Sequence, residues 1–330
     1  MYSLKEKFKG KNVVIIGDIM LDSYIMGGVE RISPEAPVPV VNIKQREDRL
    51  GGAANVALNI KALGANPILC SIVGNDNEGR ILLELMKESG ISTEFIYTST
   101  FRNTTAKTRI MAQKHQLLRL DNENTFDLSQ EENTIFQNLA ENAIPKSDVV
   151  IFEDYNKGLL THFNIPYFIK LCNEKEIPTA VDPKKKNFWE YENVTVFKPN
   201  LKELKEALNW SEDINPVTES LDIAVEQMEA KLKNKISFIT LSENGVFIKD
   251  KKESHRVPAH IRNISDVSGA GDTVISVAAL CLANNFPIYH IAQIANLAGG
   301  LVCEEPGVVP INLEKLETEL VKNIVPNVGK

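Results

Sequence analysis

The 330-residue sequence lacks the motifs and segments that define several large classes of protein. It contains no G-x-x-x-x-G-K-[ST] segment, which excludes a P-loop enzyme. No G-x-G-x-x-G follows its first strand-like run, which disfavours a dinucleotide-binding dehydrogenase. No apolar run approaches the ~20 residues that cross a bilayer, and the N-terminal residues have no hydrophobic core of a signal peptide. We therefore expect a cytoplasmic protein with no membrane partner.

Cysteine and histidine are also scarce, and acidic residues outnumber basic ones. The four cysteines are scattered through apolar segments without a C-x-x-C pair, which indicates buried free thiols in a reducing compartment. The five histidines do not have the spacing of metal ligands, so a histidine-based metal site is not expected. A formal net charge of −7 argues against a nucleic-acid partner. It still allows a local basic pocket for a phosphorylated substrate.

What the chain does contain is an alternation of short apolar runs with amphipathic stretches. This alternation predicts one α/β domain over 1–330, with a central, mostly parallel sheet flanked by helices and ligands at the carboxyl ends of the strands. The strand-like runs are 12–16, 67–73, 148–152, 178–181, 194–197 and 236–241. The helix-like stretches are 53–63, 78–89, 130–143, 163–174, 202–208 and 223–233.

Two stretches, at about 24–48 and 104–121, interrupt this alternation. They alternate between apolar and polar residues but have no crossover helices beside them. We expect them to form a small separate β-sheet. Such a sheet could act as a lid over the strand ends, or its exposed face could be a dimer contact.

The most informative segment is Asp266-Val267-Ser268-Gly269-Ala270-Gly271-Asp272-Thr273, which precedes a long apolar run. Glycines before a helix allow the backbone to approach an anion, and the free N–H groups and helix dipole then face that anion. An aspartate there suits proton abstraction from a hydroxyl group while the amides hold a transferring phosphoryl group. The alternative is a helix with an ordinary N-terminal aspartate.

Three polar positions near the start of the chain are candidates for binding a sugar. Asp18 follows the first strand-like run, and its two oxygens can accept from sugar hydroxyls, although an Asx turn is an equal alternative. Gly51 and Gly52 open a helix, and Asn55 behind them can both donate and accept. The alternative for this pair of glycines is a plain junction between loop and helix.

Cations on the predicted side sheet are candidates for binding a substrate phosphate. Lys107 and Arg109 are two residues apart and therefore share one strand face, and Arg31 is a third candidate. In isolation, a solvated charged face is the favoured explanation of each of these residues.

Acidic and basic residues also follow successive central strands. Glu153, Asp154 and Lys157 follow one strand, and Asp182 and Lys184 follow the next. Acids gathered at neighbouring strand ends destabilise the fold unless cations or ligands compensate them, so a binding site explains them better than folding does.

Two further polar segments have both a structural and a functional explanation. Asn200 and Glu203 form either a helix N-cap pair or an oxygen cluster that holds Mg²⁺ through water. Thr240, Ser242 and Gly245 form either a polar hairpin turn or a set of hydroxyl and backbone contacts to a nucleotide.

These segments, in this order, resemble the ribokinase-like (PfkB) family of carbohydrate kinases over nearly the whole chain. The most specific motif is the run from Ser268 to Thr273, and the supporting motifs are Gly51-Gly52-x-x-Asn55, Asn200-x-x-Glu203 and Thr240-x-Ser242-x-x-Gly245. Within the family, three segments resemble the kinases of D-glycero-β-D-manno-heptose 7-phosphate. They are Arg-Ile-Ser-Pro-Glu-Ala-Pro-Val-Pro-Val at 31–40, Gly-Asp-x-Met-Leu-Asp-x-Tyr at 17–24 and Asp-Tyr-x-Lys-Gly at 154–158.

The resemblance implies ATP- and Mg²⁺-dependent phosphorylation of the anomeric hydroxyl, giving a 1,7-bisphosphate for ADP-heptose and the lipopolysaccharide core. Asp272 would be the base, and the amides of Gly269, Ala270 and Gly271 would form the anion hole. The expected substrate-binding residues are Asp18, Arg31, Gly51, Gly52, Asn55, Lys107, Arg109, Asp154 and Lys157. The expected nucleotide and Mg²⁺ residues are Asp182, Lys184, Asn200, Glu203 (to the metal through water), Thr240, Ser242, Gly245, Gly271 and Asn296. The family also suggests a homodimer formed through the side sheet.

The chain departs from the family pattern at three places. Ser268 replaces a threonine, Glu153 replaces a small polar residue, and 304–308 lacks the usual basic Gly-Thr pattern. Some relatives carry a second, nucleotidyltransferase domain. Because this chain ends at Lys330, we expect a separate protein to perform adenylylation. Two alternatives stay open, namely another ribokinase-like sugar or nucleoside kinase and a non-catalytic sugar or nucleotide sensor.

Overall fold

The computed structural model describes residues 3–112, 115–210, 214–216, 218–260 and 262–324. Its larger sheet has nine strands in the order β13-β12-β11-β10-β9-β8-β1-β4-β5. The strands are β1 Asn12–Gly17, β4 Asn66–Gly74, β5 Ile96–Ser99, β8 Val149–Glu153, β9 Thr179–Asp182, β10 Val196–Phe197, β11 Ile236–Thr240, β12 Val246–Lys249 and β13 Ser254–Val257. The pairs from β5 to β11 are parallel, and β12 and β13 extend one edge in antiparallel pairs.

Helices cover both faces of this sheet. On β8, Val149 and Ile151 belong to the core beneath α2, α8 and α9, while Val150 and Phe152 belong to the core beneath α4, α5 and α7. The helices are α1 Leu4–Phe8, α2 Ala53–Ala62, α3 Asn77–Glu88, α4 Gln130–Ala143, α5 Asn164–Glu174, α6 Leu201–Ala207, α7 Glu219–Leu232, α8 Ala270–Ala283, α9 Ile288–Val302 and α10 Leu313–Ile324, with 3₁₀ turns η1 Ile144–Lys146, η2 Lys185–Asn187 and η3 Ser242–Asn244. Within the described residues, no helix has both the length and the apolar character that a membrane crossing requires.

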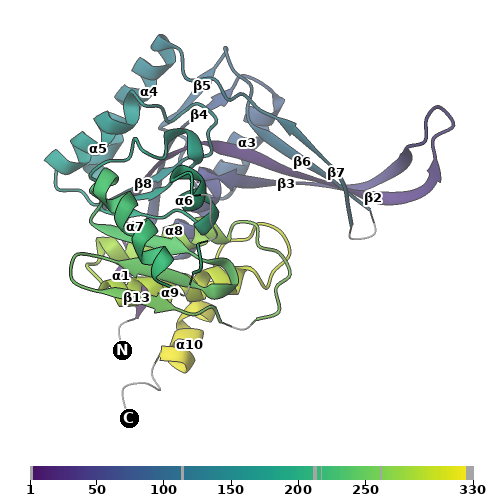
Figure 1. Ribbon diagram of the computed structural model, residues 1–330. Helices are drawn as coiled ribbons and strands as arrows, with labels where there is room; N and C mark the ends of the chain where they lie inside the picture. Colours follow the sequence, from purple (N-terminus) through teal and green to yellow (C-terminus); the bar gives the residue numbers. More distant parts are fainter. Residues whose placement is uncertain (1–2, 113–114, 211–213, 217, 261, 325–330) are drawn as a thin grey trace.

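A second sheet of four strands, in the order β3-β2-β6-β7, lies beside the main one. Its strands are β2 Ile19–Ile32, β3 Pro39–Gly52, β6 Ala106–Ala112 and β7 His115–Asn122. Figure 1 shows the long β2–β3 hairpin extending well beyond the helices that cover the main sheet. The bases of β2 and β3 lead directly from β1 and into α2, so this side sheet is anchored at the carboxyl ends of the main strands.

The predicted fold class, a large mostly parallel sheet with flanking helices and a small separate sheet, is confirmed. The side sheet starts earlier and ends later than expected, because β2 follows β1 after a single residue and β3 runs into α2. The β12–β13 hairpin was not among the predicted strands. These two strands are four residues each, too short to show a clear alternation in the sequence.

Candidate active site

The carboxyl ends of β1, β8 and β9 bring three residues side by side. Gly17 pairs with Glu153, which in turn pairs with Asp182. Glu153 follows Val149 and Ile151 in the strand alternation, so its side chain lies on the face covered by α8. A Cβ on Gly17 would lie 2.7 Å from the Cβ of Glu153, so only glycine leaves room there. The predicted gathering of acids at successive strand ends is present.

Asp272 lies in the first turn of α8 and is 5% exposed. Asn55, on α2, donates from Nδ2 to its Oδ2 at 2.7 Å, and the hydroxyl of Tyr155 donates to its Oδ1 at 2.9 Å. Burial raises the pKa of Asp272, and the hydrogen bonds from Asn55 and Tyr155 oppose this effect. The net pKa lies above that of an ordinary aspartate, which suits a group that must accept a proton.

The N-terminus of α8 is closely packed around its two glycines. Gly269 has φ of 78°, and a Cβ there would lie 2.9 Å from Nδ2 of Asn55. A Cβ on Gly271 would lie 3.5 Å from Oδ2 of Asp182 and 3.9 Å from Nζ of Lys198. The amide of Ala270 donates to Val267 O at 3.3 Å. A helix N-terminus with a buried lysine beside it is a suitable place for phosphate oxygens.

A chain of alternating charges runs along the strand ends next to this helix. Nζ of Lys198 lies 2.7 Å from Oδ2 of Asp182, and Nζ of Lys184 lies 3.6 Å from its Oδ1. Burial raises the pKa of Asp182, but the two lysines lower it by more, so the net pKa falls below its ordinary value. Burial lowers the pKa of Lys184, and Asp182 and Glu203 more than reverse that effect. Both groups are therefore charged at neutral pH.

Glu203 links this chain to α6. Its Oε1 accepts from Nζ of Lys184 at 2.7 Å, and its Oε2 accepts from the backbone N–H of Asn200 at 2.8 Å. Asn200 in turn accepts from the Glu203 amide at 2.8 Å, which completes the predicted N-cap pair. Among the described residues, no three His, Cys, Asp or Glu side chains form a group that could hold a metal. One carboxylate acting through water on a nucleotide-bound Mg²⁺ fits this donor set.

Glu153 differs from every other acid at these strand ends. It is fully buried, and neither carboxyl oxygen has a hydrogen-bond partner within the described part of the chain. Burial raises its pKa well above the ordinary value, and the charges of Asp182 and Asp272 raise it further. Glu153 therefore holds its proton to a higher pH than an ordinary glutamate does.

Asp18, directly after β1, is held in place by the loop after β8. Its Oδ2 accepts from the amides of Tyr155 and Lys157 at 2.8 and 3.1 Å. Burial and the nearby Asp154 raise its pKa to about 6. Gly52 has φ of 59°, and a Cβ there would overlap the carbonyl of Asp18. A Cβ on Gly51 would likewise overlap the carboxyl of Asp22, on β2, so both glycines permit the end of β3 to approach the start of β2 closely.

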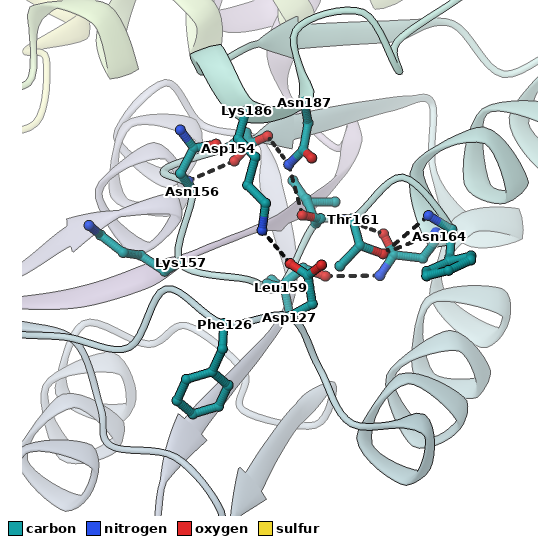
Figure 2. Close-up of polar contacts among 12 residues, drawn as sticks. Phe126, Asp127, Asp154, Asn156, Lys157, Leu159, Thr161, Asn164, Lys186 and Asn187 are labelled. Carbon is teal, nitrogen blue, oxygen red and sulfur yellow. Dashed lines mark hydrogen bonds and ion pairs between the residues drawn. The ribbon is translucent and has the colours of Figure 1, made fainter.

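Asp154 is directed to the opposite side of the main sheet. Its Oδ2 accepts from Asn187 at 3.0 Å and from the Tyr191 hydroxyl at 2.9 Å, and its Oδ1 accepts from the Asn156 amide at 2.8 Å. Figure 2 shows Asp154 between Asn156 and Asn187. Lys157 forms an ion pair of 2.7 Å with Glu123. The structure does not bring the carboxyl of Asp154 to the Asp272 side, and its predicted sugar contact remains a prediction.

The predicted phosphate-binding cations lie on the side sheet at different distances from the strand ends. Arg109 pairs with Asp22 at 2.6 Å and stacks over the ring of Tyr24 at 5.3 Å. Lys107 is half-buried on the same strand, directly opposite Asp22. Arg31 is exposed near the outer end of β2. Arg31 lies nine residues beyond Asp22, which is about 30 Å at the rise of an extended strand. The structure therefore does not bring Arg31 close to Asp272 of the same chain.

The predicted nucleotide residues at the other edge take part in backbone structure. Thr240 ends β11 and forms a bridge to Asn200. Ser242 and Gly245, with φ of 53° and 84°, form the turn into the antiparallel strand β12, so the predicted hairpin turn is present. Asn296 donates to Pro258 O at 2.8 Å. Contacts of these residues with a nucleotide remain predictions.

Two residues of the candidate site were not predicted from the sequence. One is Lys198, which is 2% exposed; a lysine that closes an apolar run is a usable signal for it in the sequence. The other is Tyr155, which lies within the Asp-Tyr-x-Lys-Gly segment at 154–158. Its contact with Asp272 joins residues 117 apart in the sequence, and no local pattern indicates such a contact.

Together, the sheet order, the small side sheet and the acid at the N-terminus of α8 define a ribokinase-like kinase fold. The chain belongs to the pfkB family of carbohydrate kinases, whose family model matches residues 11–315. It is therefore a sugar kinase, that is, a phosphotransferase with an alcohol group as acceptor, as its resemblance to the family implied.

Curated relatives are similar over most of the chain. The bifunctional protein HldE of Methylobacillus flagellatus is 38% identical over 309 residues, covering 93% of this chain and 63% of the relative. The bifunctional protein HldE of Coxiella burnetii is 39% identical over 319 residues, covering 96% of this chain and 65% of the relative. The chain thus spans less than two thirds of the length of these relatives.

Solved structures support the fold. Phosphofructokinase-2 from Escherichia coli in complex with fructose-6-phosphate superposes with a TM-score of 0.76 at 17% identity, covering 94% of this chain and 99% of that chain. Ribokinase from Arabidopsis thaliana complexed with ribose and ATP superposes with a TM-score of 0.71 at 16% identity, covering 93% and 98%.

Proposed function

We propose that the chain phosphorylates the anomeric hydroxyl of D-glycero-β-D-manno-heptose 7-phosphate with ATP, giving the 1,7-bisphosphate in the cytoplasm. The observation that carries the kinase chemistry is Asp272, held by Asn55 and Tyr155 at the N-terminus of α8. The similarity to the HldE proteins and the segment at 31–40 support the heptose phosphate as substrate. The product would feed ADP-heptose and lipopolysaccharide core synthesis, with adenylylation performed by a separate catalytic unit.

In the proposed reaction, Asp272 accepts the proton of the anomeric hydroxyl as that oxygen attacks the γ-phosphorus of ATP, and the bond from the γ-phosphorus to the β-phosphate oxygen breaks to release ADP. The backbone amides at Gly269, Ala270 and Gly271 and the ammonium of Lys198 hold the negative charge of the transferring group. Asp182 keeps Lys198 in place through their 2.7 Å ion pair. Glu203 and Asn200 would hold the water shell of a Mg²⁺ bound with ATP, which would supply further charge neutralisation.

The sugar would lie between the two sheets. Asp18, Gly51, Gly52 and Asn55 surround the place where the side sheet meets the main one. Lys107 is the stronger candidate for the 7-phosphate, because Asp22 already neutralises Arg109. At the opposite edge of the main sheet, the nucleotide would be contacted by Lys184, Thr240, Ser242, Gly245 and Asn296.

We also propose a homodimer formed through the side sheet. All eight residues of β7 are exposed, and Leu118 and Leu120, on one face of that strand, are 51% and 50% exposed. Apolar side chains in a row on an exposed strand mark a contact surface. Replacing both leucines with glutamate should yield monomers in light-scattering measurements. A double variant with an unchanged mass would contradict the proposed interface.

The first test is ADP release from ATP with D-glycero-D-manno-heptose 7-phosphate, fructose 6-phosphate, ribose and adenosine in parallel. We expect turnover on the heptose phosphate alone. Turnover on another acceptor would keep the kinase and contradict the proposed substrate. Binding of ATP without turnover on any acceptor would favour the sensor alternative.

A further inference from the structure

Tyr155 contacts all three parts of the candidate active site. Its hydroxyl donates to Oδ1 of Asp272, and its amide donates to Oδ2 of Asp18. The ammonium of Lys184 lies 5.4 Å from the centre of its ring, and that lysine pairs with Glu203. One residue therefore joins the proposed base, the proposed sugar-binding acid and the charged residues on the nucleotide side.

Few groups around Asp272 favour the ionised form of its carboxyl. Asp182 on β9 and Glu153 on β8 are acids near it, and Lys198, after β10, is the cation that opposes them. Lys198 is itself paired with Asp182 at 2.7 Å. Within the described part of the chain, the hydrogen bonds to the carboxyl are the two from Asn55 and Tyr155.

These two donors differ in what holds them. Asn55 is fully buried and lies in the first turn of α2. Tyr155 lies on the loop after β8, and its position depends on its own amide contact with Asp18. Burial and the charge of Asp272 raise the pKa of Tyr155 well above its ordinary value, so its hydroxyl keeps its proton and donates.

We propose that Tyr155 is a positioning residue for phosphoryl transfer, whose hydroxyl orients the carboxylate of Asp272 and stabilises its charged form. The inference rests on the proposed role of Asp272 as the base. A hydrogen bond to a charged acceptor is stronger than one between neutral groups and favours the ionised form. Loss of the Tyr155 hydroxyl should therefore make Asp272 take up a proton at a higher pH.

The test is the pH dependence of kcat/KM in Tyr155→Phe. The acidic limb should move to higher pH by about one to two units, as expected for the loss of one hydrogen bond to a charged group. At the foot of that limb, activity should fall about tenfold or more, and the deficit should shrink as the pH rises. A purely structural loss would lower activity by the same factor at every pH.

Tyr191→Phe is the matched control. Tyr191 also donates its hydroxyl to a buried aspartate, Asp154, at the same 2.9 Å, but on the opposite face of the sheet. Its removal should leave the acidic limb in place. An unshifted limb in Tyr155→Phe, or an equal shift in Tyr191→Phe, would overturn the inference.

A second measurement does not depend on turnover or on the Tyr155 variant folding. The chain has seven tyrosines, and in wild-type protein labelled with ¹³C at tyrosine Cζ, one resonance should report the titration of Asp272. That step should vanish in Asp272→Asn. Its persistence in Asp272→Asn would refute the contact itself. If the step behaves as expected while the enzyme does not turn over, the proposed reaction fails and the coupling of the two residues stands.

Discussion

Glu153 and Asp154 are consecutive acids at the end of the same strand, yet their surroundings are opposite. Asp154 receives three hydrogen bonds on the α5 side of the sheet. Glu153, on the α8 side, has none within the described residues and lies near the charges of Asp182 and Asp272. Fully bonded polar groups stabilise a fold, whereas unbonded ones are retained at sites that serve another purpose. The comparison separates a structural face of the strand ends from a chemical one.

The largest expected effect lies on the chemical face. Asp272→Asn keeps the shape of the side chain and removes the base, so turnover should fall about 10²- to 10⁴-fold. ATP binding, measured by calorimetry, should survive. Turnover equal to that of the wild type would refute the role of Asp272 as the base. The α8 side of the strand ends would then have no demonstrated chemical role.

On the structural face, the expected effect is on stability. Asp154→Ala leaves Asn187 and Tyr191 without their buried acceptor, so the free energy of unfolding should fall by about 2–4 kcal/mol. Denaturant unfolding measures this loss, and kinetics of the folded variant test the predicted sugar contact. A raised KM for the heptose phosphate without loss of stability would show that Asp154 serves the substrate instead.

Lys198 should show a smaller, mixed effect. Lys198→Met removes the cation beside Gly271, and Asp182 keeps Lys184 as its remaining partner. We expect the Kd for ATP to rise about tenfold, equivalent to about 1.4 kcal/mol. Lys186→Met is the control, because Lys186 pairs with Asp127 at the surface. Equal ATP affinities in the two variants would argue against a phosphate contact by Lys198.

The smallest effect should come from Glu153→Gln, and it should depend on pH. In the wild type, the folded state binds the Glu153 proton more tightly than the unfolded state does. The stability from this group is therefore complete below the ordinary pKa of 4.5 and is lost as the pH rises toward the raised folded value. Glutamine does not titrate, so the variant should gain stability relative to wild type as the pH rises. Parallel curves of melting temperature against pH would contradict a raised pKa of Glu153.

Much of the fold could be predicted from the sequence. The runs that became β1, β4, β8, β9 and β11 are strongly apolar, and the two stretches without crossover helices formed the side sheet. The Asn200–Glu203 cap pair was also visible, because it depends on residues three apart. Local patterns of this kind carry their own signal.

The contacts within the site could not be predicted in the same way. Asn55 meets Asp272 across 217 positions, and Asp18 meets the Tyr155 amide across 137. The pairing of Arg109 with Asp22, 87 residues away, likewise has no signal in the local sequence. No spacing rule covers such pairs, because the order of the strands in the sheet sets them.

The sequence by itself determined the family, the succession of strands and helices along the chain, and which residue types follow each strand. These features depend on neighbours along the chain. Only the tertiary structure decided which acids are hydrogen-bonded, which are paired with lysine and which have a raised pKa. The reason is physical: charge and hydrogen bonding at these positions depend on burial and on partners that packing brings together. Glu153 and Asp154 are adjacent in sequence, and the two faces of one sheet give them different chemistry.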